Sequence, residues 1–274
     1  MSEAIKTFAV HRLSRGRLHA ASDHLVVEEP LEIRLNGRPL AVVMRTPGED
    51  FDLARGFLLS EGLLGSADGR CPPLPDIDWA CDEFGLPIPN VVDCSLAALS
   101  AGAIAAAQRR FYATSSCGIC GRTSLERVFL QAPALQRHFT ITAAALNQLP
   151  VRLAAAQSHF TRTGGLHAAA LFSTAGELVK VCEDIGRHNA VDKALGWALS
   201  QGLYPLADFG LLVSGRLSFE MVQKALLAGI SLVAAISAAS SLAVELAGKT
   251  GMALAGFVRG GQAVIYHGHE RITR

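Results

Sequence analysis

The chain has 274 residues, of which 50% are hydrophobic and 18% charged, so it can bury a large core and is not disordered. Its 25 basic and 24 acidic residues leave a formal charge of +1, which excludes a global electrostatic attraction to nucleic acid or to an anionic membrane. Six cysteines are too few for a disulfide scaffold in a chain this long. The first residues contain no apolar signal-peptide core, so a reducing cytoplasm is expected.

The first part of the chain predicts a small α+β unit. Residues 24–45 alternate apolar and polar around Asn36-Gly37, which is typical of a β-hairpin with a type I′ turn. Residues 50–64 have the apolar spacing of a helix. Residues 65–90 contain many prolines and glycines and predict a long surface loop, and the Ala-rich residues 95–110 predict a helix.

The rest of the chain alternates between helices and strands. Near-continuous apolar strands in such an alternation indicate an α/β sandwich whose sheet is covered on both faces. We therefore expect two domains, a small α+β domain over residues 1–112 and an α/β domain over 113–274. The predicted helices are 143–160, 188–201, 218–229 and 240–250, and the predicted strands are 168–172, 178–183, 209–214, 231–236, 253–259 and 262–266.

One uncharged stretch, Ala225 to Val244, is long enough to span a membrane as a single helix. It contains glycine and several serines, and its β-branched residues cluster in the middle. We interpret it as a helix, a short buried strand and a second helix capped by Ser240 or Ser241, and expect no association with a membrane.

The most specific motif is the pair Cys117 and Cys120, which has glycines on both sides and is followed by Arg122. A nearby arginine favours the thiolate, which is the nucleophilic form of cysteine. Three chemistries use such a pair: half of a zinc site, a dithiol redox switch, or sulfur relay through a persulfide. No second paired motif supplies the remaining zinc ligands, and the preceding residues lack the strand that thioredoxin-type proteins place before the pair. The pair alone does not decide among the three.

The other cysteines are not expected to take part in chemistry. Cys182 lies in an apolar strand and is predicted to be a small buried hydrophobe. Cys71, Cys81 and Cys94 lie in or near the Pro-rich segment.

Several predicted strand ends place glycine beside a basic or acidic residue. In α/β sheets ligands bind at strand ends, and a strand followed by glycine, arginine and a helix N-terminus suits phosphate. The competing interpretation is ordinary turn chemistry, and it remains open for Glu183, Asp184, His167 and His188. The segments are Ser214-Gly215-Arg216, residues 183–189 with Arg187 and His188, Thr163-Gly164-Gly165 before His167, and Arg259-Gly260-Gly261-Gln262.

Zinc deaminases share this order of elements and carry H-x-E followed by P-C-x-x-C. Here His167 is followed by Ala168-Ala169, and a serine precedes Cys117. Deaminase chemistry is therefore disfavoured, and no metal ligand is assigned.

Taken together, the motifs resemble the FdhD family, the accessory sulfurtransferases required for formate dehydrogenase activity. The resemblance covers about Val26 to Ile272, is most specific from Thr114 onward, and does not extend to residues 65–94. The motifs are TSSCGICG, TGGLHAAAL, EDIGRHNAVDKALG, SGRLSFEMVQKALLAGI, SSLAVELA and GFVRGG.

The resemblance implies a three-layer, deaminase-like α/β/α domain without zinc chemistry, in a cytoplasmic protein that tends to form a homodimer. It implies that sulfur is taken from a cysteine desulfurase as a persulfide and passed to the bis-guanine-dinucleotide molybdenum cofactor, a cargo destined for the catalytic subunit of formate dehydrogenase. Cys117 matches the persulfide carrier and Cys120 its companion. Phe257, Val258, Arg259, Gly260, Gly261 and Gln262 match the stretch assigned to cofactor binding.

We therefore predict sulfur relay, with Cys117 as the nucleophile and Cys120 assisting release or protecting the carrier. Ser214, Gly215, Arg216 and His188 are expected to join the cofactor site, because arginines beside glycines suit the phosphates of both nucleotide arms. Two alternatives remain, a chaperone that binds and delivers the cofactor without cysteine chemistry, and a general dithiol oxidoreductase.

Overall fold

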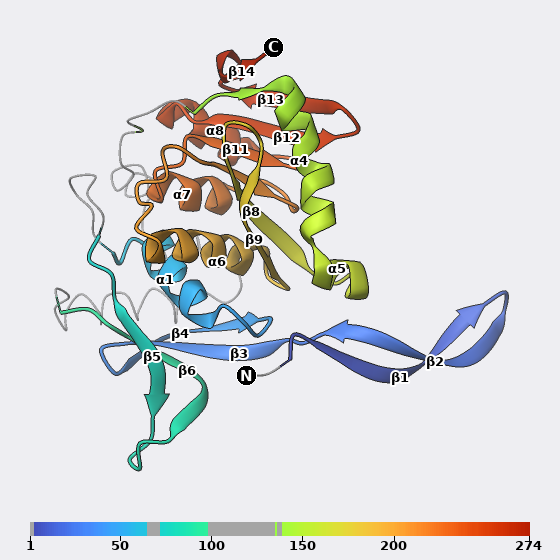
Figure 1. The fold of residues 1–274 in the computed structure, drawn as a ribbon, viewed down its shortest axis with the longest axis vertical. Helices are drawn as coiled ribbons and strands as arrows, with labels where there is room; N and C mark the ends of the chain where they lie inside the picture. The colour runs from blue at the N-terminus through green and yellow to red at the C-terminus, as the bar shows by residue number, and fades with distance from the viewer. Residues whose placement is uncertain (1–2, 65–71, 98–134, 136–138) are drawn as a thin grey trace.

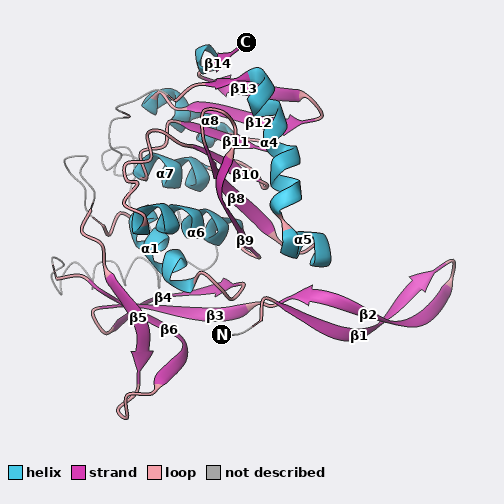
Figure 2. Cartoon of the chain, in the orientation of Figure 1, coloured by secondary structure: helices cyan, strands magenta, loops and turns pink. Residues whose placement is uncertain are grey.

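The fold is known from a computed structural model, which describes residues 3–64, 72–97, 135 and 139–274. Helices and strands are mixed throughout, as Figures 1 and 2 show. The α/β class predicted from the sequence is confirmed. The closer likeness to a deaminase stays a prediction.

A six-stranded sheet organises the second half of the chain, with strand order β13-β12-β11-β10-β8-β9. Strands β10, β11 and β12 are parallel, β8 runs antiparallel to both β9 and β10, and β13 runs antiparallel to β12. The strands are β8 (His167–Phe172), β9 (Leu178–Asp184), β10 (Gly210–Val213), β11 (Leu232–Ala235), β12 (Ala253–Arg259) and β13 (Gln262–His267).

Both faces of this sheet are covered by helices, because successive strand residues point to opposite faces. In β8, Ala169 and Leu171 face α6 (Arg187–Ser200), α7 (Phe219–Leu227) and α8 (Ser241–Thr250). Ala168 and Ala170 face the opposite side, where α4 (Ala143–Ala156) packs. The inner strands β8, β10, β11 and β12 are therefore buried on both sides, which explains why they are almost entirely apolar, whereas the outer strands β9 and β13 are partly exposed.

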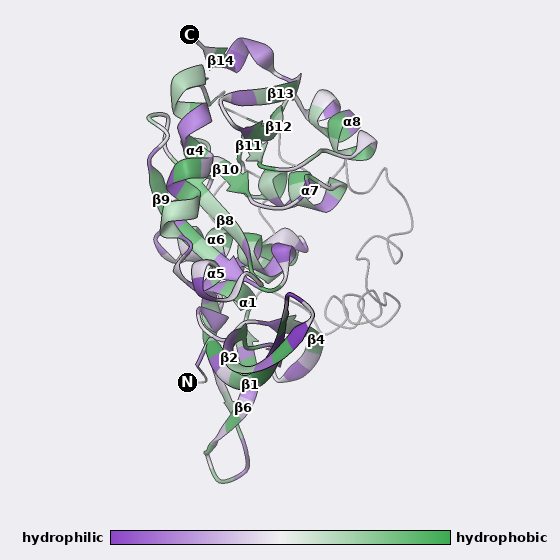
Figure 3. Cartoon of the chain, turned by 90° about the vertical axis from the view of Figure 1, so that its right-hand side faces the viewer, coloured by the Kyte–Doolittle hydropathy of each residue, from purple (hydrophilic) through white to green (hydrophobic). Residues whose placement is uncertain are grey.

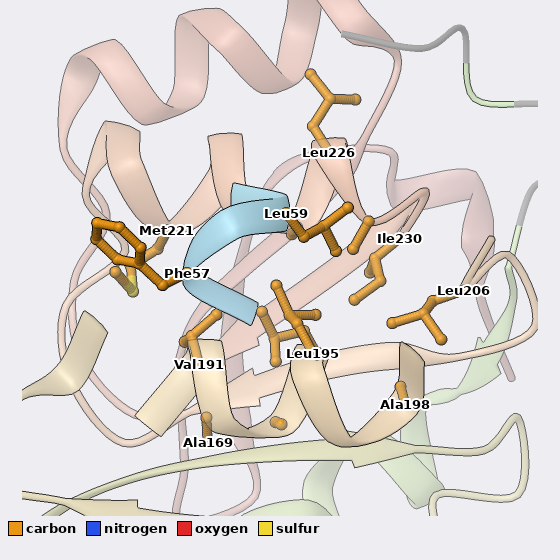
Figure 4. Packing of buried hydrophobic residues seen from close by; sticks show 14 of the residues in the cluster. Phe57, Leu59, Ala169, Val191, Leu195, Ala198, Leu206, Met221, Leu226 and Ile230 are labelled. Atoms are coloured by element: carbon orange, nitrogen blue, oxygen red, sulfur yellow. The ribbon is translucent and has the colours of Figure 1, made fainter. Parts of the chain in front are cut away.

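The N-terminal part adds a second sheet and one helix. The sheet has the order β4-β3-β6-β5. Its strands are β3 (Glu29–Leu35), β4 (Arg38–Arg45), β5 (Asp76–Cys81) and β6 (Pro87–Ser95), and α1 (Asp50–Ser60) follows β4. Helix α1 lies between this sheet and α6, and its Phe57 and Leu59 pack among side chains of α6 and α7 in one continuous core (Figure 4).

Helices α1 and α6 cross unusually closely, through two glycines. A Cβ placed on Gly56 would lie 1.8 Å from the carbonyl oxygen of Asp192, and one on Gly196 would lie 1.8 Å from that of Asp52. The two backbones therefore touch where neither helix has a side chain. This contact fixes the N-terminal part against α6.

A long two-stranded hairpin, β1 (Ile5–Ser14) and β2 (Arg17–Val26), precedes the second sheet. It extends away from the rest of the described chain as an arm (Figure 1). This hairpin was not predicted from the sequence.

Several predictions for the first part are confirmed and one is wrong. Asn36 and Gly37 have φ of 50° and 75° and join β3 to β4, as the predicted turn requires. The helix predicted over 50–64 is present and ends at Ser60. The surface loop predicted over 65–90 is wrong, because that range contains β5 and the beginning of β6.

The loop was predicted because of the prolines in this range, but their positions are compatible with a strand. Pro87 and Pro89 lie at the beginning of β6, before the stretch from Val91 to Cys94 that pairs with β3. Their missing N–H groups therefore remove no hydrogen bond from that pairing. The helix predicted over 95–110 and the domain boundary at 112/113 fall almost wholly outside the described residues.

In the second half, each predicted element is present with ends that shift by a residue or two, apart from the helix predicted over 143–160. That segment forms two helices, α4 and α5 (Ser158–Thr163), with Gln157 between them. The uncharged stretch 225–244 divides into the end of α7, strand β11 and the beginning of α8, as predicted. Among the helices that the structure describes, none is long and apolar enough to cross a membrane.

Candidate functional site

The candidate site lies along one edge of the six-stranded sheet. Strands β9, β10, β11 and β12 all run in one direction, so their C-terminal ends lie at this edge, where β8 begins with His167. Helices α6, α7 and α8 follow β9, β10 and β11, and their N-termini therefore lie at the same edge. Helix N-termini carry partial positive charge and free N–H groups, which suit anions.

Two of these helices lack a side-chain cap. Gly186 precedes α6 and Ser218 precedes α7, and neither caps its helix with a side-chain hydrogen bond. Helix α8 differs, because the Ser240 hydroxyl accepts a hydrogen bond from the Ala243 N–H at 3.3 Å. The N-termini of α6 and α7 are therefore better placed than that of α8 to meet a ligand's phosphate.

Gly215 brings the beginnings of α6, α7 and β8 together. A Cβ on Gly215 would lie 3.4 Å from Cδ of Arg187 and 3.5 Å from Nδ1 of His167. The buried Nε of Arg187 and Oγ of Ser218 have no hydrogen-bond partner among the residues that the structure describes. Unpaired polar atoms are costly when buried, so a ligand that accepts from the guanidinium would relieve that cost.

The surroundings of His167 favour its neutral form. Burial, and then the positive charges of Arg187 and His188, lower the pKa of His167 below its ordinary value. A neutral imidazole can accept as well as donate a hydrogen bond. His167 therefore adds a polar contact to the site without repelling the neighbouring arginine.

His188, predicted to bind the cofactor, is hydrogen-bonded within the protein. Its Nε2 lies 2.7 Å from Oε2 of Glu220, which joins the beginnings of α6 and α7. This hydrogen bond lowers the pKa of Glu220 below its ordinary value. Sequence reasoning missed Glu220, because nothing in a single sequence shows that residues 32 positions apart meet.

Ser214 is also engaged within the fold. Its Oγ accepts a hydrogen bond from the Ala168 N–H at 2.9 Å, and its own N–H donates to the Ala168 carbonyl at 2.9 Å. Ser214 therefore holds the end of β10 to the beginning of β8. Arg216, two residues further, is exposed and lies beside the beginning of α7.

The two acidic residues at the end of β9 have structural roles. Oδ1 of Asp184 accepts from the Gly186 N–H at 2.8 Å, and its Oδ2 lies 2.8 Å from Nζ of the buried Lys193. The carboxylate of Glu183 accepts from the N–H groups of His159 and Phe160 at 3.0 and 2.8 Å, which caps α5. The structure thus favours the turn interpretation for these two carboxylates.

The segment from Phe257 to Gln262 lies at the turn between β12 and β13. Phe257 has a φ of 52°, and its N–H donates to the Ser237 carbonyl at 3.0 Å, which joins this segment to the end of β11. The Arg259 guanidinium lies over the Phe257 ring, 5.4 Å from its centroid. Gly260 and Gly261 have no heavy atom within 4 Å of an added Cβ, so both face open space.

Val258 differs from its neighbours, because it is fully buried in the core on the α4 side of the sheet. Its side chain supports the turn from inside. Only the exposed members of this segment, such as Arg259 and Gln262, present side chains to solvent.

Cys117 and Cys120 lie outside the described residues. Of the other cysteines, Cys94 and Cys182 are buried, and burial raises the pKa of Cys94 to about 12 and that of Cys182 well above its ordinary value. Such thiols are poor nucleophiles. The buried hydrophobic role predicted for Cys182 is confirmed, with 1% exposure. Cys81 is exposed.

Comparisons with known proteins agree with the motifs. The FdhD/NarQ family matches residues 26–273. A protein of Streptomyces avermitilis called sulfur carrier protein FdhD is 50% identical, over 96% of this chain and 94% of its own length. A protein of the same name from Mycobacterium tuberculosis is 46% identical, over 96% and 97% of the two chains.

A more distant relative with this name, from Sulfolobus acidocaldarius, is 38% identical over 98% of each chain. Among solved structures, one described as a formate dehydrogenase accessory protein of Desulfotalea psychrophila has a TM-score of 0.75. It is 21% identical and covers 98% of this chain and 100% of its own, which supports the fold.

Proposed function

Because the chain belongs to the FdhD/NarQ family, we propose that it is a sulfur carrier that serves formate dehydrogenase in the cytoplasm. In this proposal a cysteine desulfurase supplies the sulfur, and the bis-guanine-dinucleotide molybdenum cofactor receives it. The observation that carries the proposal is the meeting of two uncapped helix N-termini with Arg187 and His167 around Gly215.

The sheet edge suits the phosphates of a nucleotide cargo. The N–H groups at the beginnings of α6 and α7 would donate to phosphate oxygens, and Arg187 and the exposed Arg216 would add charge-assisted hydrogen bonds. Arg259 and Gln262 would meet a second arm of the cargo at the turn between β12 and β13. Two nucleotide arms match two places on this edge that offer arginine, one with Arg187 and Arg216 and the other with Arg259.

The sulfur step uses Cys117 as the nucleophile. Its thiolate attacks the terminal sulfur of the donor persulfide, the sulfur–sulfur bond of the donor breaks, and the donor leaves as a thiolate. Cys117 then carries the sulfur as a persulfide. Attack by the Cys120 thiolate on Sγ of Cys117 would release the sulfur as hydrosulfide for the cargo and leave a disulfide, which a cellular dithiol reductant would reopen.

The sulfur step is tested by mass spectrometry. The protein is incubated with a cysteine desulfurase and cysteine, and the peptide that contains Cys117 is examined for one added sulfur. We expect the adduct in the unmodified protein and in Cys81→Ala, the matched control at an exposed cysteine, and its loss in Cys117→Ala. An adduct that persists in Cys117→Ala would contradict the carrier role.

The alternative of a chaperone without cysteine chemistry is tested by complementation. In a strain that lacks the endogenous carrier, the double variant Cys117→Ala, Cys120→Ala should leave formate dehydrogenase inactive. Full activity with the double variant would favour the chaperone. A reversible disulfide with turnover on unrelated protein disulfides would favour a general oxidoreductase instead.

The cargo site is tested with a guanine nucleotide. Because charge-assisted hydrogen bonds to phosphate are strong, we expect Arg187→Ala to weaken GDP binding about tenfold or more in titration calorimetry. Arg152→Ala, at an exposed arginine of α4 that donates to the Gly176 carbonyl in the β8–β9 turn at the opposite end of the sheet, should bind GDP normally. If Arg187→Ala and the unmodified protein bound GDP with equal affinity, the nucleotide site would not lie at this edge of the sheet.

A further inference from the structure

Among the described residues, the β1–β2 arm is supported mainly at its base, where β2 contacts α5. Its ten residue pairs run from Ile5↔Val26 to Ser14↔Arg17, and most of its side chains are exposed. An isolated two-stranded hairpin is only marginally stable in water. An arm of this length, about 33 Å at the usual rise of a strand, therefore needs a surface to lie against.

The arm is apolar and basic at its tip. Leu13 and Leu18 are paired directly across the two strands and are 70% and 68% exposed. Around them the hairpin carries four basic residues and a single acidic one, Asp23, which pairs with Arg12 at 3.0 Å. The basic residues are Lys6, Arg12, Arg15 and Arg17. The tip therefore fits a partner that is acidic and offers an apolar recess.

A second exposed hairpin in the same chain has the opposite charge. Residues 76–95, which form β5 and β6 and the turn between them, contain five acidic residues and no lysine, arginine or histidine. Phe84 and Leu86 at the turn are 79% and 63% exposed. The acidic residues are Asp76, Asp78, Asp82, Glu83 and Asp93.

A cavity of about 380 Å³ adjoins this acidic hairpin. Its apolar wall is formed by Trp79, Pro87, Ile88 and Pro89 of the hairpin. The rest of the lining comes from Asn90 and from Arg45, Pro47, Gly48 and Asp50, of which Arg45 and Asp50 are paired with each other at 2.8 Å. Pockets of this size are typical binding sites for small apolar groups. The acidic hairpin thus offers the apolar recess that the arm tip requires.

Within one chain the two hairpins do not meet. The arm and the β5–β6 hairpin project in different directions from the N-terminal part, and their tips lie far apart (Figures 1 and 3). In a symmetric pair, each copy would offer its arm to the acidic hairpin of the other, so the contact would be made twice. Because the same contact forms twice in the pair, the total buried area is twice that of one arm–hairpin contact, and no other part of the surface has to be complementary.

We propose that the tip of the β1–β2 arm docks on the β5–β6 hairpin of a second copy of this chain. Leu13 and Leu18 occupy the apolar cavity beside Trp79, and the arginines of the tip face the acidic side chains. The arm precedes residues 26–273, the part that matches the family, so this contact does not rest on the proposed function.

A charge-swap experiment tests the contact. One variant carries Arg15→Glu and Arg17→Glu, and the other carries Asp76→Lys, Asp78→Lys and Glu83→Lys. Asp82 is left intact, because its carboxylate accepts from the Phe84 and Leu86 N–H groups and holds the turn. Sedimentation of the full chain should show a dimer for the unmodified protein and about tenfold or greater weakening for each variant.

Mixing the two variants should restore a dimer, because both arm–hairpin contacts of the mixed pair are then complementary: the acidic arm meets the basic hairpin and the basic arm meets the acidic hairpin. Salt should weaken the unmodified dimer, since exposed charges are screened. A control with Arg38→Glu and Arg162→Glu, which places the same charge change elsewhere on the exposed surface, should dimerise normally.

Leu13→Ser, Leu18→Ser tests the apolar part and should also dissociate the dimer, with circular dichroism used to verify folding. Three results would overturn the proposal. They are a monomeric unmodified protein, a dimer that both charge-reversed variants retain, and failure of the mixed variants to associate.

Discussion

Charged residues serve different purposes at helix α6 and on the β1–β2 arm. At α6 they are buried. Lys224 Nζ lies 2.8 Å from Asp192 with 8% and 2% of the two side chains exposed, and it also donates to Ser60 of α1 at 2.7 Å. On the arm, Arg12 and Asp23 form a pair at 3.0 Å with 63% and 45% exposed.

The comparison shows that the contribution of an ion pair to the stability of the fold depends on how deeply the pair is buried, and not on how many pairs there are. Around α6, removal of one partner would leave the other charge without water or a counter-ion, so the pairs fix how α1, α6 and α7 pack. On the arm, water competes with every pair, so the charges contribute little to the stability of one chain. The charged side chains of the arm are therefore available for contacts with another molecule.

The largest effect is expected where α1 and α6 touch. Gly56→Ala places a methyl group 1.8 Å from the Asp192 carbonyl, a backbone atom that cannot move away alone. We expect a loss on the order of 5 kcal/mol in the free energy of unfolding, beyond ordinary overpacking. Urea unfolding followed by circular dichroism measures it.

Gly248→Ala is the matched control for this substitution. It lies within α8, and the nearest atom to its added Cβ is 3.8 Å away. Alanine should be neutral there or stabilise the helix by up to about 1 kcal/mol. If Gly56→Ala were as stable as Gly248→Ala, the close crossing of α1 and α6 would be wrong.

The next largest effect is expected from breaking the buried Lys224–Asp192 pair, compared with breaking the exposed Arg12–Asp23 pair. Lys224→Met keeps the side-chain length but leaves the buried Asp192 carboxylate with Ser60 as its remaining described partner. We expect a loss of about 3 to 4 kcal/mol in urea unfolding. Arg12→Met, at the exposed pair, should cost less than about 1 kcal/mol. Similar losses in the two variants would refute the distinction.

The smallest effect concerns Glu220, whose pKa is lowered by the hydrogen bond from His188. A carboxyl group with a lowered pKa stabilises the fold above its unfolded pKa, near 4.5, and this contribution is lost as the pH falls through the folded value. It should amount to about 1 kcal/mol or less, because the pair is partly exposed to water.

Thermal unfolding between neutral pH and pH 3 measures this contribution. The difference in Tm between the unmodified protein and Glu220→Gln should be largest near neutral pH and shrink below about pH 4.5. A difference that stays constant with pH would show that the His188–Glu220 pair does not couple to protonation.

Local patterns in the sequence determined much of the second half. Continuous apolar runs predicted the strands β8, β10, β11 and β12, because strands buried on both faces of a sheet need apolar side chains throughout. Asn36-Gly37 predicted its turn, since both residues accept positive φ. The same sequence placed Gly215 and Arg216 at a strand end before a helix, which the structure bears out.

Tertiary structure alone decided the rest, because the deciding contacts join residues that are far apart in the chain. Gly56 is exceptional only because the Asp192 carbonyl lies against it, and His188 is held by Glu220 of another helix. The strands β5 and β6 form despite their prolines because β3 lies beside the proline-free part of β6. The arm carries no strong local pattern, and only the fold shows that its basic tip points away from the acidic hairpin of its own chain.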